Sequence, residues 1–438
     1  MKYYAKRVSY KRRRNVDLIL RLLIFISCLV ASSSLTCPVI ATRVNRSPAH
    51  APESRPGPSL TIRLRAVLQV GTTSDKPLIR FSADGQLLAT GTGHGPVKVW
   101  QTLSGKLIAE LDGTDGQSPR AFCPTNDRLL ASANLKSVSL YDLSTMKLKS
   151  NIMLDKLMGG LNLFGSFSPE GQEFLIYSEG RVSLWEVETG RLITSLRCNG
   201  GFFQSSFSSD GKKVLTSCNG EKTARLWDAR SGKAIVTFSN ESNVAVSAFS
   251  PDKKTVVTTT LSGHVSVWDA VSGRLMKSWQ GHADVIFYAG FAPDGKVLTT
   301  LSRDGNMRLW DVETGKLSGT LRVGRNANDV VFSPEGKLLV VIGEGGKHEI
   351  KVWNIAKELP VLNIAGHRKD IRNVEFSPDG SLLVSSSDDA VNVWDVINRT
   401  HLAKLDNASF PASFSNDARI LATSGLKGTV ILWDVATH

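Results

Sequence analysis

A unit of about 42 residues recurs nine times along this 438-residue chain and restricts its fold more than any other feature. One copy, residues 291–311, reads FAPDGKVLTTLSRDGNMRLWD. Pro293-Asp294-Gly295 and Arg303-Asp304-Gly305 have the composition of tight turns. The run after the first turn is apolar and β-branched, and the run after the second alternates before it ends in Trp-Asp. Each copy therefore predicts two short β-strands.

The closing aromatic residue keeps its spacing through the whole repeat. It is found at Trp100, Tyr141, Trp185, Trp227, Trp268, Trp310, Trp353, Trp394 and Trp433. The mean spacing, (433 − 100)/8, is about 42 residues, and an opening Phe recurs in step from Phe81 to Phe414. A fixed period of about 40–45 residues that ends in Trp-Asp is typical of four-stranded propeller blades.

On these motifs, residues 61–438 resemble the WD40-repeat β-propeller family. The resemblance implies an all-β fold, a WD40-like β-propeller of about nine four-stranded blades. Each blade needs neighbours to cover its faces, so we expect one body rather than several domains. An eight-bladed ring is the alternative, because the second unit is weak: it has Tyr141 in place of Trp and an irregular turn at residues 124–127.

The first strand of the repeat region is predicted to close the ring. Residues 61–70, TIRLRAVLQV, alternate like a strand but precede the first full unit. The last unit ends in Trp433-Asp434 and lacks the outer strand that follows Trp-Asp elsewhere. We expect residues 61–70 to supply that strand, since the pairing removes two open sheet edges.

Residues 1–41 read as a signal peptide or a membrane anchor. A basic run that includes Lys2, Lys6, Arg7 and residues 11–14 precedes a largely apolar stretch at 18–31, and small residues follow. This order is typical of a secretory signal; the competing reading is an uncleaved anchor whose basic run stays in the cytoplasm. Residues 42–60 form a Pro/Ser-rich linker. We expect an exported (secreted or periplasmic) or membrane-anchored protein, with a cytoplasmic one as the alternative.

The formal charge of +13 lies mostly outside the repeats. Residues 1–60 hold 11 Lys/Arg and 2 Asp/Glu, a net of +9, which leaves 42 and 38, a net of +4, for residues 61–438. A nearly neutral propeller does not favour a nucleic-acid partner. Membrane contact is expected only through the N-terminal segment, if that segment is not cleaved.

The family resemblance also implies buried hydrogen-bonded tetrads of His, Ser/Thr, Asp and Trp. Two units match in full: one has His282, Thr300, Asp304 and Trp310, and the other has His367, Ser385 and Trp394 with Asp389, or its neighbour Asp388, as the acid. We interpret these histidines as structural rather than catalytic. The other blades are expected to rely on apolar packing.

No motif for bond chemistry stands out. The sequence contains no His/Cys/carboxylate cluster with metal-ligand spacing and no G-x-S-x-G nucleophile elbow. We therefore expect no catalytic residues, no metal and no cofactor. Among the cysteines, we expect free buried thiols, and a Cys198–Cys218 disulfide after export is the alternative.

The family resemblance places a protein-binding surface on the top face, where the chain enters each innermost strand. The corresponding residues are Phe164, Phe203, Phe287, Tyr288, Arg303 and Arg372. The plainer interpretation is that the aromatic rings pack between blades. We predict a non-catalytic, monomeric interaction scaffold for a protein or peptide. The alternatives are a propeller enzyme with a channel-bound cofactor and an intracellular WD40 scaffold.

Overall fold

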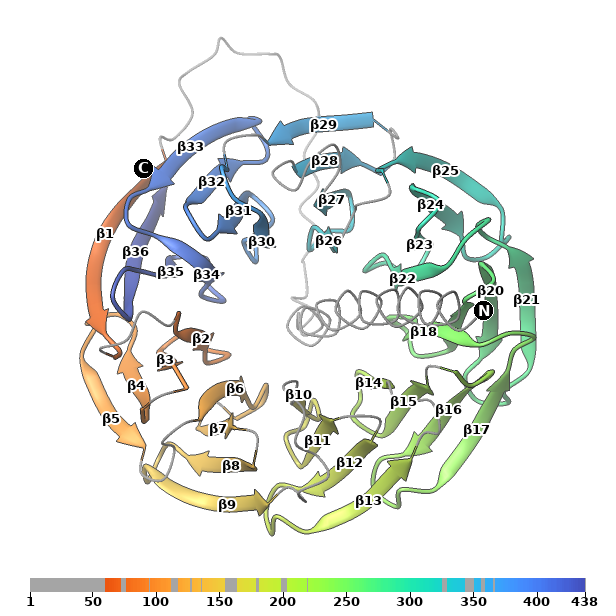
Figure 1. Ribbon diagram of the computed structural model, residues 1–438, viewed down its shortest axis with the longest axis horizontal. Helices are drawn as coiled ribbons and strands as arrows, with labels where there is room; N and C mark the ends of the chain where they lie inside the picture. Colours follow the sequence, from red (N-terminus) through yellow and green to blue (C-terminus); the bar gives the residue numbers. More distant parts are fainter. Residues whose placement is uncertain are drawn as a thin grey trace, which may run out of the picture.

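The computed structural model describes residues 60–71, 76–93, 95–111, 117–126, 128–134, 136–153, 164–178, 181–197, 203–218, 220–324, 329–342, 350–355, 359–364 and 367–437. Within them, 36 β-strands form nine four-stranded antiparallel sheets, which are the blades of one ring (Figure 1). The predicted nine-bladed propeller is confirmed. The eight-bladed alternative is wrong, because the weak second unit forms a complete blade in which Tyr141 is 1% exposed.

The blades follow one another in sequence order, each starting with its innermost strand. Blades 1 to 3 contain β2 (Leu78–Phe81), β3 (Leu87–Gly91), β4 (Val97–Gln101), β5 (Leu107–Leu111); β6 (Ser118–Phe122), β7 (Leu129–Ala133), β8 (Ser137–Asp142), β9 (Lys147–Met153); and β10 (Phe164–Phe167), β11 (Glu173–Ser178), β12 (Arg181–Glu186), β13 (Leu192–Arg197). Blades 4 to 6 contain β14 (Phe203–Phe207), β15 (Lys213–Cys218), β16 (Thr223–Asp228), β17 (Ala234–Ser239); β18 (Val244–Phe249), β19 (Thr255–Thr260), β20 (His264–Asp269), β21 (Leu275–Gln280); and β22 (Ile286–Phe291), β23 (Val297–Ser302), β24 (Asn306–Asp311), β25 (Leu317–Arg322). Blades 7 to 9 contain β26 (Asp329–Phe332), β27 (Leu338–Ile342), β28 (Ile350–Asn354), β29 (Leu359–Ile364); β30 (Ile371–Phe376), β31 (Leu382–Ser387), β32 (Val391–Asp395), β33 (Thr400–Leu405); and β34 (Ser409–Phe414), β35 (Ile420–Ser424), β36 (Thr429–Thr437), which β1 (Leu60–Gln69) completes.

Strand β1 closes the ring as the sequence predicts. It pairs antiparallel with β36, from Leu60 opposite Thr437 to Gln69 opposite Thr429, with one irregularity between Leu64 and Ala66. Its buried residue Leu68 packs in one apolar cluster with residues of blades 1 and 9. The first and last described segments are therefore held together in blade 9.

A repeated polar contact explains the turn between the first two strands of many blades. In blade 5, the Ser250 hydroxyl donates to the Asp252 carboxylate at 2.6 Å and accepts from the Thr255 backbone N–H at 3.0 Å. The same Ser–Asp pair forms in blades 1, 4, 8 and 9, at Ser82, Ser208, Ser377 and Ser415. The turn composition seen in the sequence thus fixes the hairpins locally.

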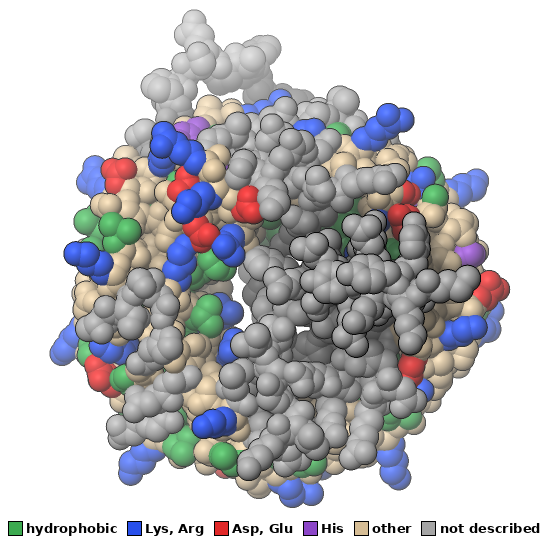
Figure 2. All heavy atoms as spheres, viewed as in Figure 1, with side chains coloured by type: hydrophobic (Ala, Val, Ile, Leu, Met, Phe, Trp, Pro, Cys, Tyr) green, Lys and Arg blue, Asp and Glu red, His purple; other side chains and the backbone are tan. Residues whose placement is uncertain are grey.

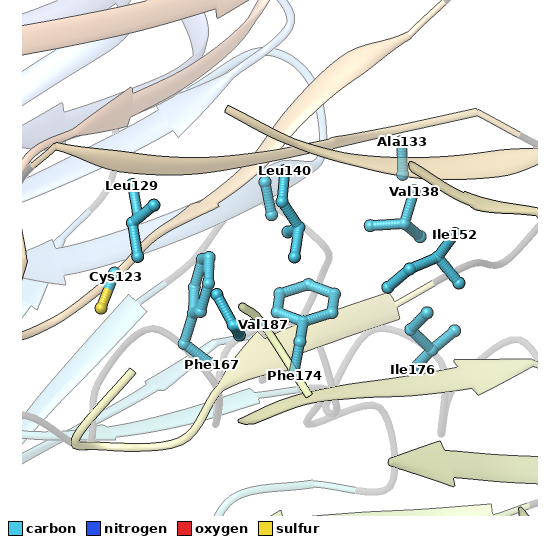
Figure 3. Close-up of a cluster of buried hydrophobic side chains, with 11 residues drawn as sticks. Cys123, Leu129, Ala133, Val138, Leu140, Ile152, Phe167, Phe174, Ile176 and Val187 are labelled. Carbon is cyan, nitrogen blue, oxygen red and sulfur yellow. The ribbon is translucent and has the colours of Figure 1, made fainter. Parts of the chain in front are cut away.

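The apolar core lies between neighbouring blades. In the cluster of Figure 3, Leu140 and Ile152 of blade 2 face Phe174 and Ile176 of blade 3. Phe174 also meets Phe167 edge to face, with ring centroids 4.8 Å apart. Similar clusters join blades 6 and 7 and blades 8 and 9. Each sheet is thus covered by its neighbours, which is what the repeat pattern requires.

One half-buried carboxyl group links blades 8 and 9. Glu375 on β30 accepts hydrogen bonds from the Phe414 backbone N–H at 3.1 Å and the Ser413 hydroxyl at 3.3 Å, both on β34. Burial raises the pKa of Glu375 to about 7; these two hydrogen bonds and the positive charge of Arg80 only partly offset the effect. The folded state therefore binds this proton more tightly than the unfolded chain does.

We predict that Glu375→Gln stabilises the protein at pH 8 but not at pH 4. The folded-state pKa of Glu375 lies above the ordinary value of 4.5. The protonated carboxyl group therefore stabilises the folded state below pH 4.5, and this stabilisation is lost as the pH rises from 4.5 to about 7. The variant should gain at most about 3 kcal/mol in unfolding free energy above pH 7. Urea unfolding across this pH range measures the gain, and Glu313→Gln, at an exposed turn, is the control. Parallel pH profiles for wild type and Glu375→Gln would contradict the assignment.

Candidate functional site

The first predicted tetrad lies in one hydrogen-bonded network on the top face, the side on which the innermost strands begin. His282 precedes β22, Thr300 lies on β23, Asp304 in the following turn and Trp310 on β24. The His282 ring contacts Asp304 Oδ2 through Nδ1 at 3.0 Å and Thr300 Oγ1 through Nε2 at 2.8 Å. Trp310 Nε1 donates to the same Thr300 hydroxyl at 2.8 Å. The network ties the entry of β22 to the two strands behind it.

The surroundings of this tetrad keep the histidine neutral at pH 7. Burial lowers the pKa of His282, and the hydrogen bond and negative charge of Asp304 do not fully offset this effect. Burial raises the pKa of Asp304, but the hydrogen bonds from Asn306 and His282 outweigh burial. The pKa of Asp304 is therefore lowered. A neutral imidazole with both nitrogens engaged suits a structural role better than acid–base chemistry.

The second predicted set also comes together, with one additional member. His367 contacts the Ser385 hydroxyl through Nε2 and the Ser387 hydroxyl through Nδ1, each at 2.8 Å. Trp394 Nε1 donates to Ser385 at 3.2 Å. Ser387, which the sequence analysis did not select, donates to Asp389 at 2.5 Å and so stands between the histidine and the acid. Of the two possible acids, Asp388 and Asp389, the network contains Asp389.

This network extends across blade 8 in a way the sequence analysis missed. Buried Asn392 contacts His367 Nε2 at 3.1 Å through its amide nitrogen and His401 Nε2 at 3.2 Å through its amide oxygen. The Trp394 and His401 rings also pack together, with centroids 4.5 Å apart. No local motif marks Asn392 or His401, because their partners lie on other strands.

Blades without the histidine keep part of the network. The indole N–H donates to a Thr hydroxyl of the second strand, at 2.8–2.9 Å, in the pairs Trp100–Thr90, Trp227–Thr216, Trp268–Thr258 and Trp433–Thr423. The expectation that these blades rely on apolar packing was therefore incomplete. The signal was present in the sequence: a Thr recurs 10 or 11 residues before these tryptophans.

Phe287 was wrongly placed on the predicted docking surface. Its side chain is 4% exposed and belongs to the apolar cluster between blades 6 and 7, so a partner cannot reach it. Tyr288 is half-buried against the same cluster. The plainer interpretation, that these rings pack between blades, holds for both. The side chains of Phe164 and Phe203 lie outside the described residues.

The two predicted arginines reach the top face. Arg303 is half-buried in the turn after β23, and Arg372 on β30 is exposed. Arg372 donates through Nε and Nη2 to Asp388 Oδ2, at 2.9 and 2.7 Å. Lys76, which precedes blade 1, binds the other oxygen of Asp388. Asp388, the acid that is not in the tetrad, therefore bridges basic residues of blades 8 and 1.

Charged side chains gather over blade 8, as Figure 2 shows at upper left. We define the blade 8 rim as Arg368, Lys369, Asp370, Arg372 and Asp388, which are exposed or half-buried. Burial would raise the pKa of Asp388, but the hydrogen bonds from Lys76 and Arg372 outweigh burial and lower it. The rim therefore presents fixed charges of both signs.

The expectation of free thiols is right for one described cysteine and wrong for another. Cys123 is a free, buried thiol in the cluster between blades 2 and 3. Cys218, at the end of β15, is disulfide-bonded. Cys198, the partner considered in the sequence analysis, lies outside the described residues. Within the described part of the chain, no group of three His, Cys, Asp or Glu residues could hold a metal ion.

We predict that His282→Ala lowers the free energy of unfolding by about 1–3 kcal/mol, because half-buried Asp304 and buried Thr300 lose a partner. Denaturant unfolding followed by tryptophan fluorescence measures the loss. The matched control is His264→Ala, since His264 is half-buried at the start of the neighbouring β20 and its ring takes no part in the tetrad. Equal losses in the two variants would contradict a specific role for the network.

Two family models match parts of the chain. The model "WD domain, G-beta repeat" matches residues 358–395, which include most of blade 8 up to Asp395. The model "Cytochrome D1 heme domain" matches residues 250–352. Among the described residues of the second stretch, His282 is buried with both ring nitrogens engaged, so it could bind haem iron only if the tetrad opened.

Similar proteins share short stretches with this chain. "WD repeat and SOCS box-containing protein 1" of Takifugu rubripes is 30% identical over 92 residues, 20% of this chain and 22% of the relative. "Eukaryotic translation initiation factor 3 subunit I" of Candida albicans is 27% identical over 136 residues, 28% of this chain and 39% of that protein. The chain thus spans about a fifth of the length of the first of these relatives.

A solved structure supports the fold over a longer stretch. The C-terminal WD40 domain of Sif2 superposes with a TM-score of 0.56 at 16% identity, and the match covers 72% of this chain and 94% of that domain. At this identity the likeness concerns the fold alone. Together with the nine-fold sequence repeat, the ring of nine blades and the family model that matches residues 358–395, it supports a WD40-repeat β-propeller.

Proposed function

We propose that this propeller is a non-catalytic scaffold that binds a protein or peptide on its top face and acts as a monomer. The observation that carries the proposal is a closed ring whose buried histidines, His282 and His367, are engaged in networks between its own strands. Such a ring presents loops in a fixed arrangement and works by contact. One relative is itself named as a subunit of a translation initiation factor, which agrees with a role in assemblies.

The blade 8 rim, together with Arg303, is the part of the top face we assign to partner binding. Arginine is enriched among residues that dominate binding energy. Arg372 is exposed, and its ion pair with Asp388 already restricts its side chain. Arg372 would therefore lose little conformational entropy when a partner binds. Phe164 and Phe203 stay predictions for the same face.

We further propose that the chain is exported, either secreted or tethered through residues 1–41. The basic run followed by apolar residues 18–31 supports this proposal. The disulfide at Cys218 also supports it, because disulfides persist in oxidising compartments. The described residues contain no helix able to span a membrane, and residues 1–41 lie outside them.

A propeller enzyme with a bound cofactor is the second candidate, favoured by the match of residues 250–352 to a haem-domain model. A haem would give an absorption band above 300 nm in the protein purified from its source. Protein without such a band that still captures partners would favour the scaffold.

We predict that Arg303→Ala/Arg372→Ala reduces the capture of proteins from a source extract by at least about tenfold. The matched control is Arg230→Ala/Arg274→Ala, two exposed arginines in turns on the opposite face. Quantitative mass spectrometry compares what each full-length variant retains. A partner set that is unchanged in the first variant, or lost equally in both, would place the interaction elsewhere.

We predict that the mature protein lies outside the cytoplasm and contains an oxidised Cys218. N-terminal sequencing of the exported or membrane fraction should show either cleavage before the linker or the intact leader. Peptide mapping without reductant should find Cys218 in a linked peptide and Cys123 in a free one. A full-length cytoplasmic chain with a reduced Cys218 would contradict export.

A further inference from the structure

Two cations from distant parts of the chain converge on one carboxylate on the top face. Arg372 on β30 donates through Nε and Nη2 to Asp388 Oδ2, at 2.9 and 2.7 Å. Lys76, which precedes β2, contacts the other oxygen of the same group. The structure therefore contains a carboxylate bound between a guanidinium and an ammonium group, which shows the kind of ligand that this pair of cations accepts.

The turn that carries Asp388 is fastened by its neighbour. Asp389 accepts a hydrogen bond from the Ser387 hydroxyl at 2.5 Å. Its two oxygens also accept from the backbone N–H groups of Arg368 and Lys369, at 3.1 and 3.2 Å. These contacts join the turn to the residues before β30, so the position of the turn does not depend on the carboxylate of Asp388.

All three charged groups are within reach of a molecule in solution. The side chains of Arg372, Lys76 and Asp388 are 44%, 36% and 26% exposed. Exposed ion pairs are weak, because water competes for both charges. An external carboxylate can therefore reach the two cations and replace Asp388, and the apolar core between the blades is not involved.

The charge around this pair favours an acidic partner. This part of the top face has four exposed cations: Arg368, Lys369, Arg372 and Lys76. Three acids accompany them: Asp370, Asp388 and Asp389. Because Asp389 is committed to the turn, the surface offers a partner more positive than negative charge. A positive potential at an interface selects a partner of negative charge.

We propose that Arg372 and Lys76 form a binding site for acidic side chains of a protein partner, and that Asp388 occupies this site until such a side chain replaces it. The inference rests on the proposed function, which assigns the blade 8 rim to partner binding. A partner carboxylate takes over the contacts of Asp388, so the two cations keep their orientation. Because Asp388 is attached to the ring, it competes at a high effective concentration with every partner. Weakly acidic segments are thereby rejected, which makes the surface more specific.

This arrangement predicts that loss of the Asp388 charge strengthens the binding of an acidic segment. Asp388→Asn keeps the size of the side chain, but a partner no longer has to break its charge-assisted contacts. The variant also leaves Arg372 and Lys76 less ordered before binding, which opposes the gain. We expect the gain to exceed this cost, because one carboxylate that contacts two cations is held better than an isolated exposed pair.

Fluorescence anisotropy tests the prediction with a peptide of alternating Glu and Gly residues that carries an uncharged dye. Both ends of the peptide are blocked, so only its side chains are charged, and a peptide with Gln in place of Glu is the neutral comparison. The full-length chain is measured in a non-ionic detergent at low salt, where screening is small. The matched control is Asp406→Asn, since Asp406 is exposed in the turn after β33 on the same face.

Asp388→Asn should bind the Glu peptide at least about threefold more tightly than wild type, and Asp406→Asn should differ from wild type by less than about 1.5-fold. Arg372→Gln in the Asp388→Asn background should remove the gain. The Gln peptide should not distinguish the variants. Circular dichroism checks the fold, and Asp388→Ser is the second variant at this position.

Equal gains in Asp388→Asn and Asp406→Asn would mean that the peptide responds only to overall charge, and would overturn the proposal. It is also overturned by unchanged or weaker binding in Asp388→Asn, by a gain that survives Arg372→Gln, or by a Glu peptide that no variant binds. Loss of the fold in both Asp388 variants would make this residue structural, with the same consequence.

The outcome is separate from that of the scaffold proposal, which depends on the capture of proteins by Arg303→Ala/Arg372→Ala. If capture requires these arginines but Asp388→Asn binds the Glu peptide as wild type does, the scaffold stands and the exchange of carboxylates fails. If Asp388→Asn shows the expected gain but capture does not require the arginines, the carboxylate site stands and the assigned partner surface fails.

Discussion

The fold depends on the burial of both faces of every blade by its neighbours. A four-stranded sheet of this size cannot cover its own apolar faces, so blades 2 and 3 share one cluster around Phe174, and the other blades do likewise. A linear stack would leave two terminal faces and two strand edges in water. Pairing of β1 with β36 removes both defects at once, and the ring is the result.

Buried polar networks fix the positions of some loops relative to the packed blades. In blades 5 and 6, His282 joins the loop before β22 to Thr300 and Asp304, and in blade 8 a longer chain runs from His401 to Asp389. A buried polar group is costly unless it is satisfied, so each network permits few arrangements of its loop. Rigid loops on the top face are what a surface that acts by contact needs.

The blade 8 rim is the outward feature on which the proposed partner contact rests, and it offers charged groups held by one another. The disulfide at Cys218 and the leader-like sequence of residues 1–41 are independent observations, and both support the proposal that the chain is exported.

The sequence by itself determined the nine-fold repeat and the strand at residues 61–70, because both follow from the period, and its resemblance to the family implied the members of the first tetrad. The choice between eight and nine blades stayed open until the structure showed that the second unit forms a complete blade. Only the tertiary structure decided the burial of Phe287, the insertion of Ser387 between His367 and Asp389, and the bridge from Asp388 to Lys76. Those outcomes depend on which side chains of different strands and blades meet. The local pattern specifies a strand and its inward face, but the packing of neighbouring blades sets what each side chain touches.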